Sequence, residues 1–211
     1  MKIIEKFDRQ FEYASILMNV FIAFQFFLLW MHPQISDVDK IATLSALMLF
    51  EFVMVHSGVF MAVMPKKLSL YILIPFYGVF AWAFNHMVDD NLILIAYAMV
   101  ILNRMRFAFS DVSKEIRNRA ILRSVLSALI YFLLFFPAVL ASAYIPKFGL
   151  NEAFIQASGY GISNNTGGIF VEFPHASMAF GVAYYCLLAI MESRFLKRNF
   201  VGKQIVTISK T

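Results

Sequence analysis

Long apolar runs constrain this chain more than any other feature of its sequence. A helix needs about 20 mostly apolar residues to cross a bilayer. Six stretches meet this condition, at residues 13–31, 41–64, 68–88, 91–109, 121–145 and 176–194. Because 61% of the residues are hydrophobic and only 15% are charged, the composition excludes an ordinary soluble domain. The sequence therefore predicts an all-α integral membrane protein, with residues 1–211 forming a single six-helix transmembrane domain.

The lysine and arginine residues predict how these spans are oriented. If the N-terminus lies in the cytoplasm, 16 of the 18 basic residues fall on or toward that side, and only Lys40 and Lys147 face outward. Cytoplasmic loops of membrane proteins carry such an excess of positive charge. We therefore expect both termini to lie in the cytoplasm. We also expect the protein to reside in a bacterial inner membrane. The basic face should contact anionic lipid headgroups, so its charge does not require nucleic acid as a partner.

Two segments outside the spans and two prolines inside them complete the expected architecture. Residues 110–123 form a basic cytoplasmic connector that we expect to be a capped helix. Residues 146–175 form a long outer loop, and its five glycines disfavour a helix. Pro75 and Pro137 fall inside the third and fifth spans, where proline favours a kink.

The second span carries ionisable groups inside the stretch FEFVMVHSGVFM, residues 50–61. At 1.5 Å per residue, Glu51 lies about 15 Å below the outer boundary, and His56 lies about 7 Å deeper. A charge at this depth costs at least about 2.5–3.5 kcal/mol, so Glu51 requires a partner or a neutralising proton. Gly58 and Ala62 share its helix face and would let another helix approach closely. We therefore expect Glu51 to face a neighbouring helix.

The fourth span offers a partner for Glu51, because it is short and ends in polar residues. Arg104 lies about 17–20 Å below the outer boundary, a depth close to that of Glu51. The sequence therefore predicts a buried polar cluster, whose members are Glu51, His56, Ser57, Asn103 and Arg104. In the alternative, Arg104 extends to the cytoplasmic headgroups and Glu51 is protonated or bonded to the backbone. Tyrosines such as Tyr131 and Tyr184 are assigned to helix packing or to the membrane interfaces.

The other three histidines are all expected at the outer boundary. His32 ends the first span, His86 ends the third and His175 begins the sixth, and each has a methionine nearby. Imidazoles and thioethers that converged there could bind a divalent metal or copper. This site requires three helices to meet, and histidine also suits the headgroup region on its own. A metal site and three separate interfacial histidines are therefore both compatible with the sequence.

Three classes of function remain open from the sequence. A small transporter or channel would use the buried cluster for protons or a cation. A non-catalytic scaffold or sensor subunit would dock through the connector and the outer loop. A membrane enzyme would need catalytic groups that converge, and only the outer histidines offer such a set. We favour transport, and we expect a homo-oligomer or a partner subunit because six helices make a small bundle.

Overall fold

The computed structural model describes residues 7–86, 91, 94–95, 97–98, 114–160 and 169–208. Within these ranges the regular secondary structure is helical and there is no strand. Three of the helices are long and apolar enough to cross a membrane, over Arg9–Met31, Ile121–Leu140 and Pro174–Lys197. The fold is therefore all-α, and these three helices are compatible with an integral membrane protein.

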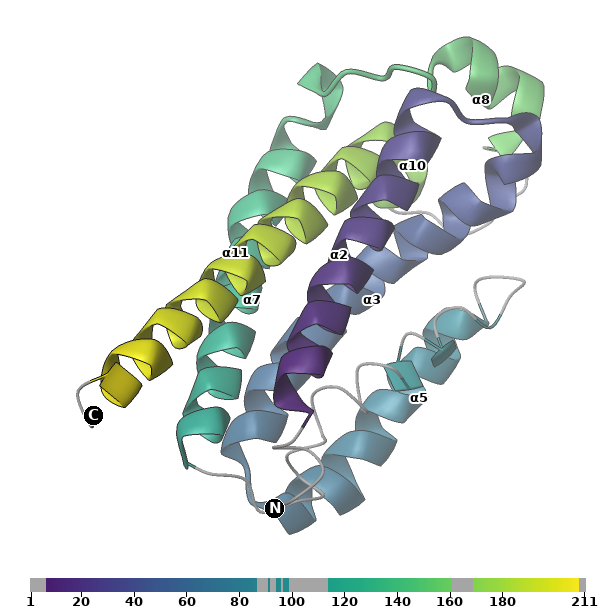
Figure 1. The fold of residues 1–211 in the computed structure, drawn as a ribbon. Helices are drawn as coiled ribbons and strands as arrows, with labels where there is room; N and C mark the ends of the chain where they lie inside the picture. The colour runs from purple at the N-terminus through teal and green to yellow at the C-terminus, as the bar shows by residue number, and fades with distance from the viewer. Residues whose placement is uncertain are drawn as a thin grey trace.

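Long helices lie side by side and are joined by short helical pieces (Figure 1). The long helices are α2 (Asp8–Met31), α3 (Val38–Val63), α5 (Ile74–Asn85), α7 (Lys114–Leu140) and α11 (Pro174–Ile208). The short pieces are η1 (Ile35–Asp37), α4 (Lys66–Leu68), η2 (Ser69–Leu73), η3 (Ser142–Tyr144), α8 (Glu152–Ser158) and α10 (Ile169–Glu172). We call the end of the bundle where α2 and α7 begin the terminus end, and the end that carries η1, η3 and α8 the loop end.

Helix α11 is the centre of the bundle. It packs along α2 and also contacts α7 and α3, whereas α5 lies beside α3. Half of its apolar window is buried (50%), against 22% for the windows of α2 and α7. Gly181 lets α2 approach closely, because a Cβ atom at that position would lie 2.3 Å from Cδ1 of the fully buried Phe26. Small residues at such a contact are typical of helix pairs in membranes.

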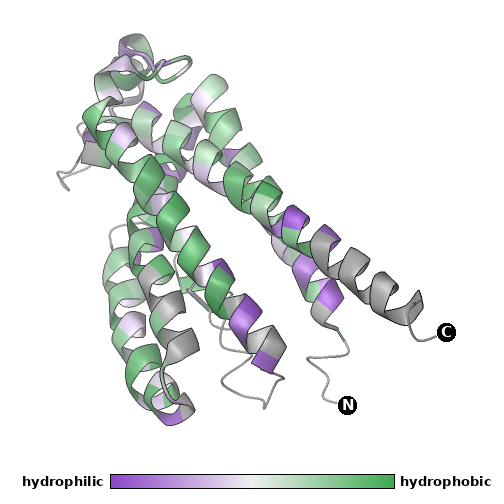
Figure 2. Ribbon diagram, turned by 90° about the vertical axis from the view of Figure 1, so that its left-hand side faces the viewer, coloured by the Kyte–Doolittle hydropathy of each residue, from purple (hydrophilic) through white to green (hydrophobic). Residues whose placement is uncertain are grey.

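The outward faces of the long helices are apolar. Leu17 and Phe21 on α2, and Leu133 and Leu140 on α7, are all at least 61% exposed. Figure 2 shows hydrophobic residues along the middle of the long helices and hydrophilic residues toward their ends. An apolar surface of this extent is unfavourable in water but suits contact with lipid chains.

The expected kink at Pro75 coincides with an irregular segment. The run from Lys66 to Asn85 contains the π-helix η2 over Ser69–Leu73, and the N–H of Ile74 bonds to the Ser69 carbonyl. Proline has no N–H and displaces the carbonyl four residues before it, so a wider turn at this point relieves the clash. Pro137 lies inside α7, which continues through it to Leu140.

Several predicted boundaries differ from the structure. Helix α7 begins at Lys114, so the described part of the 110–123 connector belongs to the same helix as the fifth span. The helix ends at Leu140 and not at residue 145, and α11 continues to Ile208, well past residue 194. Of the predicted fourth span, 91–109, the structure describes only residues 91, 94–95 and 97–98.

The prediction that the outer loop is non-helical is wrong for two stretches, because it contains α8 and α10. Local capping explains α8. The side chain of Asn151 accepts a hydrogen bond from the Phe154 N–H at 3.0 Å, and Gly159 ends the helix with a left-handed φ of 66°. An Asn cap and a left-handed glycine terminate short helices well.

The outer loop is anchored onto the loop end of α2. The Trp30 indole N–H donates to the Pro146 carbonyl at 2.8 Å, and the Gly149 N–H donates to the Trp30 carbonyl at 3.1 Å. A Cβ atom at Gly149 would lie 2.2 Å from Cδ of Pro33, so only glycine fits there. Beyond this anchor, Leu150, Tyr160 and Phe170 are almost fully buried. The described parts of this loop, residues 146–160 and 169–175, therefore pack into the loop end of the bundle.

Candidate functional site

Glu51 is the buried carboxylate of α3. Its side chain is only 7% exposed, although the residue lies near the middle of a 26-residue helix. His56 and Ser57 also belong to α3, but their side chains lie outside the described part of the structure, as do residues Asn103 and Arg104. The five-residue polar cluster therefore stays a prediction, and only the surroundings of Glu51 can be described.

Two tyrosines, one on α7 and one on α11, form hydrogen bonds with α3 at or near Glu51. The Tyr184 hydroxyl of α11 donates a hydrogen bond to Glu51 Oε1 at 2.9 Å. The Tyr131 hydroxyl of α7 donates to the Met48 carbonyl, one helical turn from Glu51, at 2.8 Å. Both tyrosines are 0% exposed, and their ring centroids lie 5.4 Å apart in an edge-on arrangement. Three helices thus meet at one polar site.

This site lies at mid-height in the bundle. Counted along each helix from the loop end, Glu51 is about 20 Å from the start of α3, and Tyr184 is about 15 Å from the start of α11. Tyr131 lies about 14 Å from the end of α7 at Leu140. Aromatic rings, including Phe180 and Phe135, surround the tyrosines. The carboxyl and the phenol are therefore held far from both ends of the bundle.

Sequence reasoning assigned Tyr131 and Tyr184 to packing or to the interfaces, and it missed their contacts with the Glu51 segment. The position of these two tyrosines in the sequence could have predicted the contacts. Both tyrosines lie near the middle of apolar runs rather than at the ends, where interfacial tyrosines belong. A buried phenol requires a hydrogen-bond acceptor, and Glu51 offers one at the same depth.

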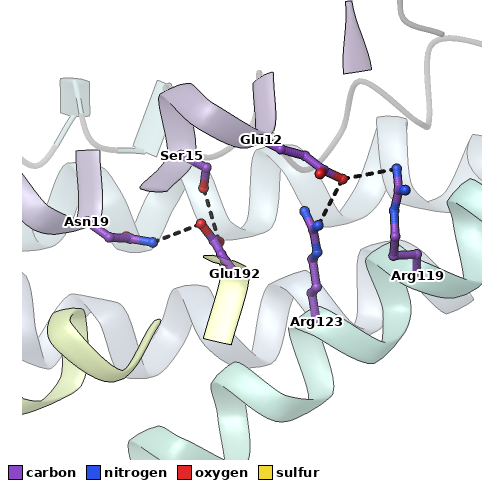
Figure 3. Close-up of polar contacts among 6 residues, drawn as sticks. All are labelled: Glu12, Ser15, Asn19, Arg119, Arg123 and Glu192. Atoms are coloured by element: carbon purple, nitrogen blue, oxygen red, sulfur yellow. Dashed lines mark hydrogen bonds and ion pairs between the residues drawn. The ribbon is translucent and has the colours of Figure 1, made fainter. Parts of the chain in front are cut away.

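A second polar cluster joins α2 to α7 near the terminus end (Figure 3). Glu12 of α2 is 4% exposed, and its Oε1 lies 2.8 Å from an Arg123 nitrogen and 3.2 Å from an Arg119 nitrogen. The two arginines are four residues apart on α7, so they share one helix face. Both guanidinium groups are mostly buried, with 16% and 19% of the side chain exposed. We call these three residues the latch.

Glu192 of α11 forms a neighbouring cluster with α2. Its two carboxylate oxygens accept hydrogen bonds from Ser15 at 3.1 Å and from the Asn19 amide at 3.2 Å (Figure 3). Sequence reasoning missed both clusters because it considered polar partners only for the second and fourth spans. The alternation of Glu12, Ser15 and Asn19 at helical spacing was the signal for a polar face on α2.

The structure does not bring the three outer histidines together. His32 caps the end of α2 and is exposed, as is His86, whose ring contacts Trp82 with centroids 4.4 Å apart. His175 is instead buried, 3% exposed, with Nε2 3.0 Å from the Ser142 carbonyl. Among the described residues, no group of three or more His, Cys, Asp or Glu side chains is placed to hold a metal ion.

Comparison with known proteins does not assign a function to these clusters. No family model matches the chain, and it matches neither a curated protein nor a solved structure. Any functional conclusion therefore rests on the clusters around Glu51 and Glu12.

Proposed function

We propose that the protein is a six-span membrane transporter or channel that moves protons or a small cation through Glu51, with both termini in the cytoplasm. Helices α2 and α7 begin at the terminus end, where α11 ends, and α3 runs in the opposite direction to α2 (Figure 1). Two further crossings between Val63 and Lys114 would satisfy this alternation, and α5 is suited to be the first. The basic residues favour the terminus end as the cytoplasmic one.

One observation supports the transport proposal above the others. A carboxyl group is held at mid-height in an apolar bundle, and in the described contacts a tyrosine hydroxyl donates to it. A neutral donor can stabilise a carboxylate, and it can rotate to accept from a protonated carboxyl. Glu51 can therefore take up and release a proton, or exchange it for a cation, without rearranging the backbone. Ionisable groups inside membrane bundles commonly mark such pathways.

Transport would also require a second conformation. At 7% exposure Glu51 is closed off in the present arrangement, which corresponds to an occluded state of the proposed cycle. Aromatic residues pack around Tyr131 and Tyr184, and these would have to move before water could reach the carboxyl. Such motions between helices belong to the microsecond-to-millisecond range of collective rearrangements.

Ion flux into liposomes tests this proposal. The purified protein is reconstituted with a pH-sensitive dye inside, and flux is driven by a potassium diffusion potential. We expect Glu51→Gln to lower proton or cation flux roughly tenfold or more, which corresponds to about 1.4 kcal/mol. Glu152→Gln is the matched control, because Glu152 is an exposed acid at the loop end with 81% of its side chain accessible. Equal flux in wild type and Glu51→Gln would contradict the proposal.

A second candidate is a non-catalytic scaffold or sensor subunit, and it has its own supporting observation. Glu12, Glu51 and Glu192 all contact side chains of another helix, so each carboxylate also acts as a clamp. For a scaffold, the wild-type protein should give no flux, and Glu51→Gln should lower thermal stability in detergent. The apolar outer faces would then meet a partner subunit or a second copy, which light scattering of the purified protein would detect.

A further inference from the structure

We propose that the latch of Glu12, Arg119 and Arg123 closes a cytoplasmic access route to Glu51, so that breaking it opens this end of the bundle. This inference rests on the proposed function for its biological meaning. Whether or not the protein transports ions, α2 and α7 are held together at the terminus end mainly by this one ion cluster. A polar face of α7 leads inward from the cluster.

The first support is how differently α2 contacts its two neighbours. Helix α2 packs along α11, where Gly181 admits Phe26, and Glu192 adds two hydrogen bonds. By contrast, the backbones of α2 and α7 approach each other only marginally within the described residues. The latch nevertheless joins them with N–O distances of 2.8 and 3.2 Å. Because the two backbones approach so little, loss of the ion cluster would remove the described direct link between α2 and α7, while α7 stays packed on α3 and α11.

The second support is the face of α7 that continues from the latch. Arg119, Arg123, Ser127 and Tyr131 follow one another at four-residue spacing, so each is next to the one before it on the helix surface, and the series winds around α7 by about 40° per step. Exposure falls along this series from 19% and 16% for the arginine side chains to 7% for Ser127 and 0% for Tyr131. Tyr131 contacts Tyr184, which donates to Glu51. A polar face thus connects the latch with the Glu51 site.

The loop end is closed by a different kind of contact. Phe170 is 1% exposed and stacks on Phe180 with centroids 5.6 Å apart, and Leu150 and Tyr160 are also buried there. The same segment is fixed to α2 through Trp30. Opening this end would expose several large apolar side chains, whereas opening the latch would hydrate groups that water solvates well. We therefore expect the bundle to open at the latch, at the terminus end, before it opens at the loop end.

Cysteine labelling tests the inference directly. The background carries Cys186→Ser, which removes the one native cysteine, an exposed residue of α11. Ser127→Cys then supplies a nearly isosteric reporter just inside the latch. Its rate of reaction with a charged, membrane-impermeant thiol reagent is measured in inside-out membrane vesicles. We expect Glu12→Gln to raise this rate roughly tenfold or more, the change that about 1.4 kcal/mol produces in an equilibrium.

Two further variants keep the test falsifiable. Glu192→Gln is the matched control, because it weakens a polar contact between α2 and α11. These two helices remain packed against each other, so the labelling rate should be unchanged. Exchanging the charges with Glu12→Arg and Arg123→Glu should restore the slow rate. An unchanged rate in Glu12→Gln, or equal acceleration in Glu192→Gln, would overturn the latch. If the latch variants behave as expected but no variant or wild type shows flux, the transport proposal fails and the latch stands.

Discussion

Glu12 and Glu51 are two buried glutamates in one bundle, with similar exposure but different partners. Glu12 is 4% exposed and lies within ion-pair distance of two arginines. Glu51 is 7% exposed, and its described hydrogen bond comes from the phenol of Tyr184. Glu12 is held by charged donors, whereas the Tyr184 hydroxyl is a neutral group that can donate or accept a hydrogen bond. This contrast underlies our proposal that the first site holds helices together and the second exchanges a proton.

The largest expected effect on stability comes from removing Glu12, the charged partner of Arg119 and Arg123. Replacing Glu12 by Ala leaves two mostly buried guanidinium groups without this carboxylate, which should cost about 3–5 kcal/mol of stability. Glu51→Gln keeps an acceptor for Tyr184, so the change at this described hydrogen bond should cost under about 1 kcal/mol. Thermal unfolding in one detergent, followed by helical circular dichroism, compares the two variants. A comparable loss for Glu51→Gln would break the contrast and point to a charged partner such as the predicted Arg104.

A packing substitution sharpens the contrast between ionic and apolar attachment of α2. Gly181→Leu should destabilise the α2–α11 pair by about 1–3 kcal/mol, because the added side chain would occupy the position of Phe26. The same replacement at Ala183, which is only half-buried on α11, is the control and should have a smaller effect. If Gly181→Leu has no effect, the close approach of α2 and α11 at this point is not required for stability.

The tyrosine donors allow a smaller and more specific comparison. Tyr184→Phe removes the hydrogen bond to Glu51, and Tyr131→Phe removes the bond to the Met48 carbonyl. Each should cost about 0.5–1.5 kcal/mol of stability, because the ring packing is retained. Tyr184→Phe should change the flux more than Tyr131→Phe, because the Tyr184 hydroxyl donates a hydrogen bond to the carboxyl. Similar flux changes in both variants would mean that the aromatic packing, and not the donor, controls the site.

The smallest effect is expected at a surface pair of the loop end. The Lys40 ammonium, 2.8 Å from Asp37, lowers the pKa of that carboxyl; partial burial opposes this, and the Gln34 N–H lowers it further. A carboxyl with a lowered pKa stabilises the fold above its unfolded pKa of about 3.9, and this contribution is lost as the pH falls further. We expect about 0.2–1 kcal/mol from this exposed pair. Asp37→Asn should reduce the pH dependence of stability in that range; an unchanged dependence would assign the effect to other groups.

The sequence predicted the all-α class and the approximate positions of several long helices, because apolar runs and prolines act locally. The ends of α2 and α3 fall within a few residues of the expected positions, but α7 and α11 extend further into polar sequence. An apolar run marks where lipid contact ends, whereas a helix continues as long as its backbone bonds and local propensity allow. Asn151 and Gly159 were capping signals for α8 that the glycine content of the loop obscured.

The site was harder to predict because it depends on which helices are neighbours. Helical geometry indicates that Glu51 faces another helix, but it does not identify α11 as that helix. The latch also requires α2 and α7 to meet near the terminus end, which no local pattern encodes. Depth along each span was the useful guide. It places Tyr184 and Tyr131 near Glu51, and it places Glu12 near Arg123 at the start of the apolar windows.

Infrared spectroscopy of the protein in bilayers tests the central contrast most directly. The stretching band of protonated carboxyl groups is recorded while the pH is lowered from neutral, for wild type, Glu51→Gln and Glu12→Gln, each first shown to be helical and monodisperse. We predict that Glu51→Gln loses part of the band that appears on acidification. An unchanged band in Glu51→Gln, or a loss confined to Glu12→Gln, would contradict the assignment of Glu51 as the proton-exchanging carboxyl.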